Sequence, residues 1–171
     1  MDRLTDIGLW LGRRAENVCA VLLASMFVTF LLQVLFRYFL NLPVGWTVEW
    51  VTIAWLWGIL FGYAFVVREV DVIRLDLVYG IVPPWLRRGF DLVSGLTVAL
   101  VFAWTLPQAW DYVAFMSIER TAYIRLPFSI VFAIYIPFAV AVILRSLATA
   151  WAALRGAPSK VFGDHSGHAY D

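Results

Sequence analysis

Four uncharged apolar stretches recur along the chain, and charged residues gather between them. The stretches cover residues 18–36, 50–67, 92–110 and 126–144, so each is 18 or 19 residues long. A helix of that length crosses the hydrocarbon core of a bilayer with little tilt. The pattern predicts an all-α integral membrane protein in which residues 1–155 form a single domain of four transmembrane helices.

The segments outside the spans are expected to lie at the membrane surface or in water. Apolar residues recur at helical spacing within residues 1–17, which favours a short amphipathic interfacial helix, with a frayed tail as the alternative. A second interfacial helix is expected around residues 72–82, ended by Pro83 and Pro84. The polar, glycine-containing tail over residues 156–171 is expected to be disordered.

The distribution of basic residues predicts the orientation in the membrane. Four spans place both termini on the same side. Ten of the 13 Lys and Arg residues fall in the N-terminal segment, the second connection and the region after the last span, and the other three are Arg37, Arg120 and Arg125. Because basic residues accumulate on the cytoplasmic side, both termini are predicted to be cytoplasmic.

The second span carries a face of small residues and a collar of aromatic ones. Ala54, Gly58 and Gly62 are four residues apart and therefore share one side of a helix. Small residues at this spacing let another helix approach closely, although a lone span with incidental glycines is the alternative. Glu49 stands at the mouth of the span. Three tryptophans lie in its first half and a fourth lies just before it: Trp50, Trp55, Trp57 and Trp46.

The third and fourth spans contain a second small-residue face and two prolines. Gly95, Ala99 and Ala103 are again four residues apart. Pro107 is expected to kink the end of the third span and Pro137 the middle of the fourth, because proline removes a backbone donor inside a helix.

The first span carries a polar stripe that ends in a charge. Ser25, Thr29, Gln33 and Arg37 follow one another at intervals of four residues. Since polar groups facing lipid are costly, the stripe is expected to face protein, as a site of helix–helix hydrogen bonding rather than a conducting path. Arg37 and Glu49 flank the first connection, and either they pair at one membrane face or each is solvated separately.

Composition narrows the possible functions. Hydrophobic residues make up 63% of the chain and charged residues 15%, against about a quarter charged in soluble domains. A net charge of +1 gives nucleic-acid binding no electrostatic support. The span interiors hold no Asp, Glu, Lys, Arg or His, which argues against haem ligation, hydrolysis and self-sufficient ion coupling. His165 and His168 could bind a metal only weakly, so no catalytic, metal or cofactor site is expected.

Several short motifs, taken in order, resemble one family. The segment 33–38 reads Gln-Val-Leu-Phe-Arg-Tyr, and later positions continue the pattern: Asn41, Pro43, Trp46, Glu49, Trp55, Gly58, Gly62, Arg68, Glu69, Ile73, Arg74, Asp76, Arg120, Arg125, Pro127, Tyr135 and Pro137. From about Asn17 to Leu147 the chain resembles the DctQ-like small membrane subunit of tripartite ATP-independent periplasmic (TRAP) transporters. Two positions depart from the family pattern: Val48 stands where a carboxylate is frequent, and Val72 where histidine is frequent.

The resemblance implies a supporting role in transport at a bacterial inner membrane. A large membrane subunit carries substrate and sodium, and a periplasmic substrate-binding protein delivers the substrate, usually an organic acid. The small subunit, surrounded by lipid, braces the large one and helps dock the binding protein. A stand-alone four-helix transporter and a membrane anchor of another complex are the alternatives. The candidate partner-interface residues are Gln33, Arg37, Trp46, Glu49, Trp55, Gly58, Gly62, Arg68, Asp76, Arg125 and Pro127.

Overall fold

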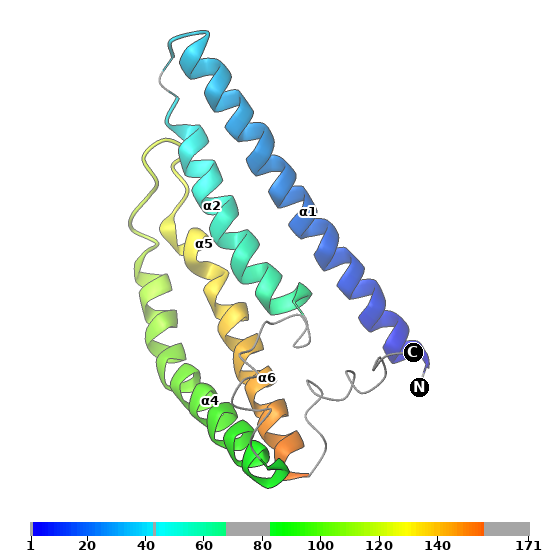
Figure 1. The fold of residues 1–171 in the computed structure, drawn as a ribbon. Coiled ribbons are helices and arrows are strands. Elements are labelled where there is room, and N and C mark those ends of the chain that lie inside the picture. The colour runs from blue at the N-terminus through cyan, green and yellow to red at the C-terminus, as the bar shows by residue number, and fades with distance from the viewer. Residues whose placement is uncertain (1, 43, 68–82, 156–171) are drawn as a thin grey trace, which may run out of the picture. The chain divides into compact units, whose positions relative to one another are not determined.

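The described part of the chain is helical. The computed structural model describes residues 2–42, 44–67 and 83–155, so the interfacial helix expected over residues 72–82 and the tail over residues 156–171 lie outside the described residues. The elements are α1 (Asp2–Tyr38), α2 (Trp46–Phe61), the π-helix η1 (Gly62–Val66), α4 (Pro84–Phe115), α5 (Phe128–Ala133) and α6 (Tyr135–Leu154) (Figure 1).

Four helical segments of the described chain are long and apolar enough to cross a membrane, which confirms the predicted all-α membrane class. Each extends beyond the uncharged stretch that predicted it, because backbone hydrogen bonding continues where side chains become polar at the membrane surface. The segments are Gly12–Tyr38, Trp46–Val66, Trp85–Phe115 and Phe128–Leu154.

The N-terminal segment differs from the predicted arrangement. Helix α1 runs from Asp2 to Tyr38 without a break, so residues 2–17 continue the first span instead of forming a separate helix or a frayed tail. Residues 2–36 contain neither proline nor a turn motif that would end the helix. Asn41 caps the C-terminal end of α1. Its φ of 51° belongs to the left-handed region that asparagine tolerates. The Leu42 N–H then donates to the Phe36 carbonyl at 3.0 Å.

Contacts divide the chain into two units, which are described separately. The first comprises residues 1–66 and 108–138, and the second comprises residues 67–107 and 139–171. In the first unit α1 packs along α2 and η1 (Figure 1). Ala54 and Ala64 are buried there, and the glycine face of α2 meets α1 at Gly62, where an added Cβ would lie 3.6 Å from the Cys19 sulfur.

The polar stripe of the first span is only partly buried. Thr29 is 6% exposed, as expected for a group that faces protein. The Ser25 hydroxyl instead donates to the Leu22 carbonyl at 2.7 Å, within its own helix. A serine hydroxyl that bonds within its own helix needs no partner on another helix. Thr29 therefore faces protein as predicted, whereas Ser25 does not form the predicted hydrogen bond between helices.

Pro137 has its predicted effect as a break between α5 and α6. Proline clashes with the carbonyl four residues earlier, which is that of Ala133, the last residue of α5. Carbonyls in the last turn of a helix lack partners further along it. One of them, on Val131, accepts a hydrogen bond from the Trp57 indole N–H at 3.1 Å. A side chain of α2 thus bonds to a backbone carbonyl next to the break.

In the second unit part of the small-residue face noted on the third span packs on α6, a partner that the sequence did not specify. Gly95 and Ala99 are buried, whereas Ala103 is exposed. A Cβ added to Gly95 would lie 2.8 Å from the Ser146 carbonyl oxygen and 3.2 Å from both the amide nitrogen and the Cβ of Ala150. The close approach of the two backbones therefore depends on the missing side chain. Helix α4 itself continues through Pro107 to Phe115.

This contact predicts a difference between two Gly→Ala substitutions on the same helix. Gly95→Ala is expected to lower the free energy of unfolding by about 1–3 kcal/mol, because rigid backbone atoms of α6 must move to admit the methyl group. Gly89→Ala has nothing within 4 Å of its added Cβ, and alanine is the better helix former by roughly 1 kcal/mol. Thermal unfolding of the two variants in one mild detergent gives the comparison. Equal or greater stability of Gly95→Ala would contradict this packing.

Candidate functional site

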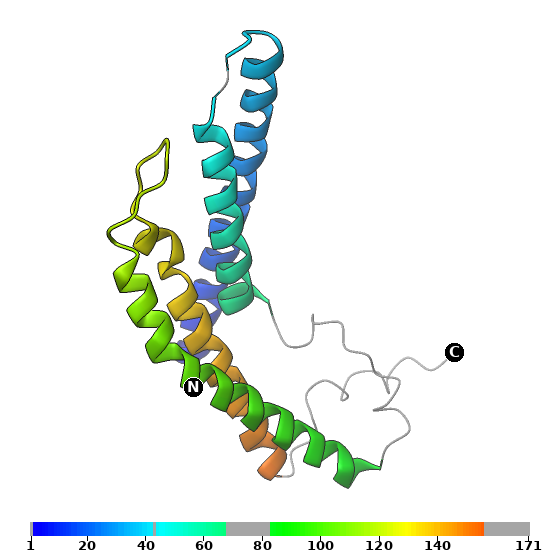
Figure 2. The same cartoon turned by 90° about the vertical axis from the view of Figure 1, so that its left-hand side faces the viewer.

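A short hairpin joins α4 to α5 in the first unit. The Phe128 N–H donates to the Glu119 carbonyl at 3.0 Å, and the Thr121 N–H donates to the Leu126 carbonyl at 2.9 Å. These bonds pair the two arms of residues 119–128, which project beyond the helices that they connect (Figure 2). The sequence does not predict this hairpin, because hydrogen bonds between backbone groups leave no periodic pattern in the side chains.

The tip of the hairpin is a tight turn that is closed from within. Arg125 has a φ of 59°, in the left-handed region that non-glycine residues rarely adopt. The Leu126 N–H donates to the Thr121 hydroxyl at 3.0 Å, across the base of the tip. Successive backbone N–H groups in such turns point in one direction and form a concave anion-binding site.

The carboxylate of Glu49 occupies this concave site. Its Oε1 accepts a hydrogen bond from the Tyr123 N–H, and its Oε2 accepts one from the Ile124 N–H, both at 2.9 Å. The Ala122 N–H and the Thr121 hydroxyl also donate toward the carboxylate. Backbone N–H groups at a tight tip have few partners within the tip itself, so the carboxylate satisfies donors that would otherwise need water. One side chain of α2 therefore holds the hairpin.

The start of α2 is shaped to bring Glu49 to the hairpin. Thr47 is fully buried, and its hydroxyl donates to the Val44 carbonyl at 2.9 Å. Gly45 precedes the helix, and a Cβ added there would overlap the ring of Tyr123. Glycine thus lets the hairpin tip approach the helix start. A carboxylate in the first turn is also favoured by the positive end of the helix dipole.

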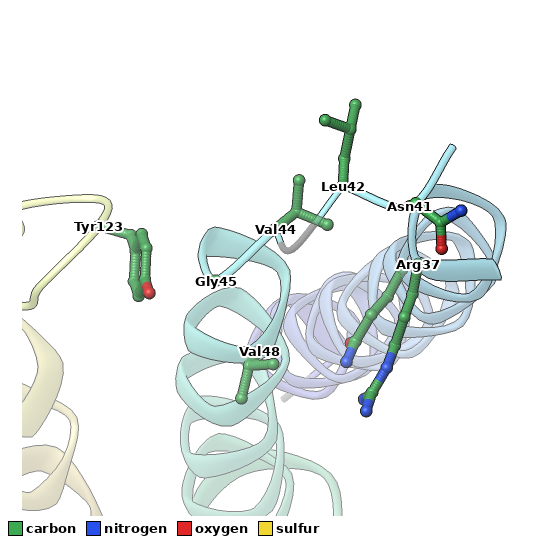
Figure 3. Close-up of a pocket in the computed structure, with 8 residues that line it drawn as sticks. Arg37, Asn41, Leu42, Val44, Gly45, Val48 and Tyr123 are labelled. Carbon is green, nitrogen blue, oxygen red and sulfur yellow. The ribbon is translucent and has the colours of Figure 1, made fainter. Parts of the chain in front are cut away.

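A pocket of about 470 Å³ lies beside this contact. Tyr123 stands on one side of the first turn of α2, and Arg37 and Asn41 stand on the other (Figure 3). Arg37 is the one charged residue among those that line the pocket. The full lining consists of Gln33, Arg37, Asn41, Leu42, Val44, Gly45, Val48 and Tyr123.

The structure assigns Glu49 partners that neither alternative from the sequence included. The carboxylate is neither paired with Arg37 nor simply solvated, since its hydrogen bonds go to the hairpin tip. Arg37 contributes instead to the pocket, together with Gln33. Two rim charges that are close in sequence therefore serve different contacts within the same unit.

Four further candidate residues, Trp46, Trp55, Gly58 and Pro127, are spread over the first unit. Trp46 and Trp55 are 40% and 58% exposed, and Gly58 has nothing within 4 Å of an added Cβ. Pro127 precedes α5 with an extended backbone and bridges to Arg120 on the opposite arm of the hairpin. Arg68, Asp76 and Val72 lie outside the described residues.

Sequence reasoning missed three residues that build the site. Thr121, Tyr123 and Gly45 belong to none of the motifs or spacings that the sequence offers. Their importance comes from contacts between segments more than seventy positions apart. No group of three or more His, Cys, Asp or Glu within the described ranges is placed to hold a metal ion.

The carboxylate contact predicts a local effect of neutralising Glu49. In Glu49→Gln, one acceptor oxygen becomes an NH₂ donor that faces a backbone N–H, so one of the two hydrogen bonds is lost and the other loses its charge. Hydrogen exchange at the amides of Tyr123 and Ile124 is expected to accelerate severalfold, as measured by exchange mass spectrometry in detergent.

Glu119→Gln is the matched control, because it removes the same charge from an exposed side chain in the hairpin itself. Its exchange at the hairpin tip should stay at the level of the unmodified protein. Identical protection of the tip in Glu49→Gln and in the unmodified protein would show that the carboxylate does not hold the hairpin.

Comparisons with known proteins give one match. No curated protein and no solved structure matches the chain significantly. The family model described as the DctQ component of tripartite ATP-independent periplasmic transporters matches residues 26–156. That range contains the end of α1, the first connection, α2 and the hairpin, and it covers well over half of the sequence. The chain therefore belongs to the DctQ component family of tripartite ATP-independent periplasmic transporters.

Proposed function

We propose that this multi-pass membrane protein is the non-catalytic small subunit that braces the large transport subunit of its TRAP transporter. The bracing surface is the outward side of α2, and the hairpin over residues 119–128 helps dock the periplasmic substrate-binding protein. Substrate and sodium pass through the large subunit during uptake of an organic acid. The chain resides in the bacterial inner membrane with both termini in the cytoplasm, the orientation that its basic residues predict.

The observation that carries the bracing role is the open position at Gly58 on α2, beside an exposed tryptophan. Trp55 is 58% exposed, and the Cβ position of Gly58 is free of neighbours within 4 Å. A glycine on an open helix face gives close access to the backbone, which favours another helix, whereas lipid chains gain nothing from it. The next glycine along the same face, Gly62, already approaches α1. Ala54, one turn before Gly58 on the same side, is 2% exposed. The open position at Gly58 therefore lies between two positions that pack within the chain.

The docking role is supported by the exposure and rigidity of the hairpin. Tyr123 is 64% exposed, and Arg125 is exposed at the tip. Both stand on a backbone that Glu49 holds in place. An exposed aromatic residue and an arginine on a held loop are residue types enriched at protein interfaces. The absence of ionisable residues from the span interiors supports a chain that does not itself couple ions to transport.

The bracing proposal predicts different effects of two glycine substitutions. Gly58→Leu is expected to weaken copurification with the large subunit while leaving the thermal stability of the isolated chain unchanged, because the added side chain points into open space in this chain. Gly62→Leu is expected to lower the stability of the isolated chain itself, because its Cβ would lie 3.6 Å from the Cys19 sulfur and the larger side chain would push against α1.

Copurification from the native membrane in mild detergent, followed by thermal unfolding of each separated chain, distinguishes the two effects. Undiminished copurification of the large subunit with Gly58→Leu would exclude this face as the bracing surface. Gly12→Leu, which also adds its side chain to an open position, controls for a nonspecific effect of leucine.

Reconstitution tests the supporting role directly. The probe is the organic acid that most stabilises the cognate binding protein in a thermal-shift screen. Sodium-driven uptake is expected only in liposomes that contain both membrane subunits and the binding protein, and liposomes with this chain alone should take up none. Uptake by this chain alone would favour the alternative of a stand-alone transporter. Full sodium-driven uptake in liposomes that lack this chain would contradict the bracing role.

A further inference from the structure

The pocket beside Glu49 has a positive end and an apolar side. Arg37 supplies its one formal charge, and the side chains of Gln33 and Asn41 supply further polar groups. Leu42 and Val48 contribute apolar surface and are 53% and 52% exposed. A pocket of about 470 Å³ with this division offers hydrogen-bond donors to an anion and an apolar surface to whatever is attached to it.

The pocket lies at the depth of the lipid headgroups. Arg37 is in the last turn of α1, directly after the uncharged stretch over residues 18–36. The next span begins at Trp46, only nine positions later. The connection between two successive spans must lie at a membrane surface, and tryptophan is enriched at that level. An arginine that ends a span is therefore placed where phosphate groups are concentrated.

The positive charge of the pocket is not neutralised by the acidic residue nearest to it along α2. The Glu49 carboxylate bonds to the hairpin tip, and Glu49 is not among the residues that line the pocket. The hairpin thus removes a carboxylate that could have paired with Arg37. Arginine binds phosphate oxygens through two parallel N–H donors, so Arg37 is well suited to bind a phosphate group in the pocket.

We propose that this pocket binds the phosphate of an anionic membrane phospholipid. Arg37 contacts the phosphate, the amides of Gln33 and Asn41 hydrogen-bond to the headgroup, and an acyl chain lies along Leu42 and Val48. The apolar side of the pocket beside Arg37 favours a ligand in which a phosphate is joined to acyl chains. The inference rests on the membrane location of the chain and is independent of the bracing and docking roles.

Native mass spectrometry of the full-length chain tests lipid binding. The purified, delipidated protein in a neutral detergent is titrated with phosphatidylglycerol, with a diacylglycerol of the same acyl chains, and with glycerol phosphate. Phosphatidylglycerol is expected to bind at least fivefold more tightly than either, because only it has both the phosphate and the chains. Equally tight binding of the diacylglycerol would show that the phosphate is not recognised and would overturn the proposal. Equally tight binding of glycerol phosphate would overturn the assignment to a lipid.

Substitutions on two sides of the pocket locate the site. Arg37→Gln is expected to weaken binding of phosphatidylglycerol about fivefold or more, since one arginine near a membrane surface contributes on the order of a fivefold effect. Val48→Glu places a competing carboxylate on the pocket wall and should weaken binding similarly. Val48→Gln is its neutral control, and Arg120→Gln removes an exposed charge outside the pocket. Both controls should bind as the unmodified protein does.

The combined results decide the proposal. Retained binding in both Arg37→Gln and Val48→Glu would overturn it. Loss of the large subunit from Arg37→Gln with lipid binding retained would overturn it in favour of a carboxylate on that partner. If Val48→Glu fails to give a monodisperse protein, Arg37→Gln and Arg120→Gln provide the decision alone.

Discussion

The hydrogen bonds between the Glu49 carboxylate and the hairpin tip are the contact on which the rest of the site depends. The tip contains a left-handed Arg125 and presents the N–H groups of Tyr123 and Ile124 on one side. Because donors buried without partners destabilise a fold, such a turn needs an anion, water or a change of shape. Glu49 supplies the anion. With the tip held there, the Tyr123 ring lies against Gly45 and both residues line the neighbouring pocket.

The same requirement for satisfied backbone groups explains the irregular points of the spans. Inside a bilayer there is no water to replace a missing partner, so a break in a helix must be compensated by another element. Beside the break ahead of Pro137, the indole of Trp57 donates to the Val131 carbonyl. In the second unit, no break is needed and close packing comes from Gly95. The Trp57 indole thus bonds to a backbone carbonyl beside an interrupted helix, whereas Gly95 lets two helices approach each other closely.

The sequence predicted the features that depend on local patterns. Four spans follow from uncharged length, the packing face at Gly95 and Ala99 from spacing, and the irregularity at Pro137 from its missing donor. The extent of α1 and the partners of Glu49 could not be predicted in this way. A helix continues past its apolar stretch whenever nothing ends it, and the hairpin meets α2 through backbone groups that every residue type possesses. The identity of Thr121 or Tyr123 carries little trace of that meeting.

The Glu49 carboxylate also competes with free anions for the N–H groups of the hairpin tip. Glu49 is covalently attached to the same chain as the N–H groups that it binds. Its effective concentration at the tip is set by the chain and reaches the order of millimolar or above. Free organic acids in the surrounding solution must compete with this tethered ligand for the same donors. A turn that is bound by a carboxylate of its own chain therefore keeps its N–H donors occupied when free anions are present well below that concentration.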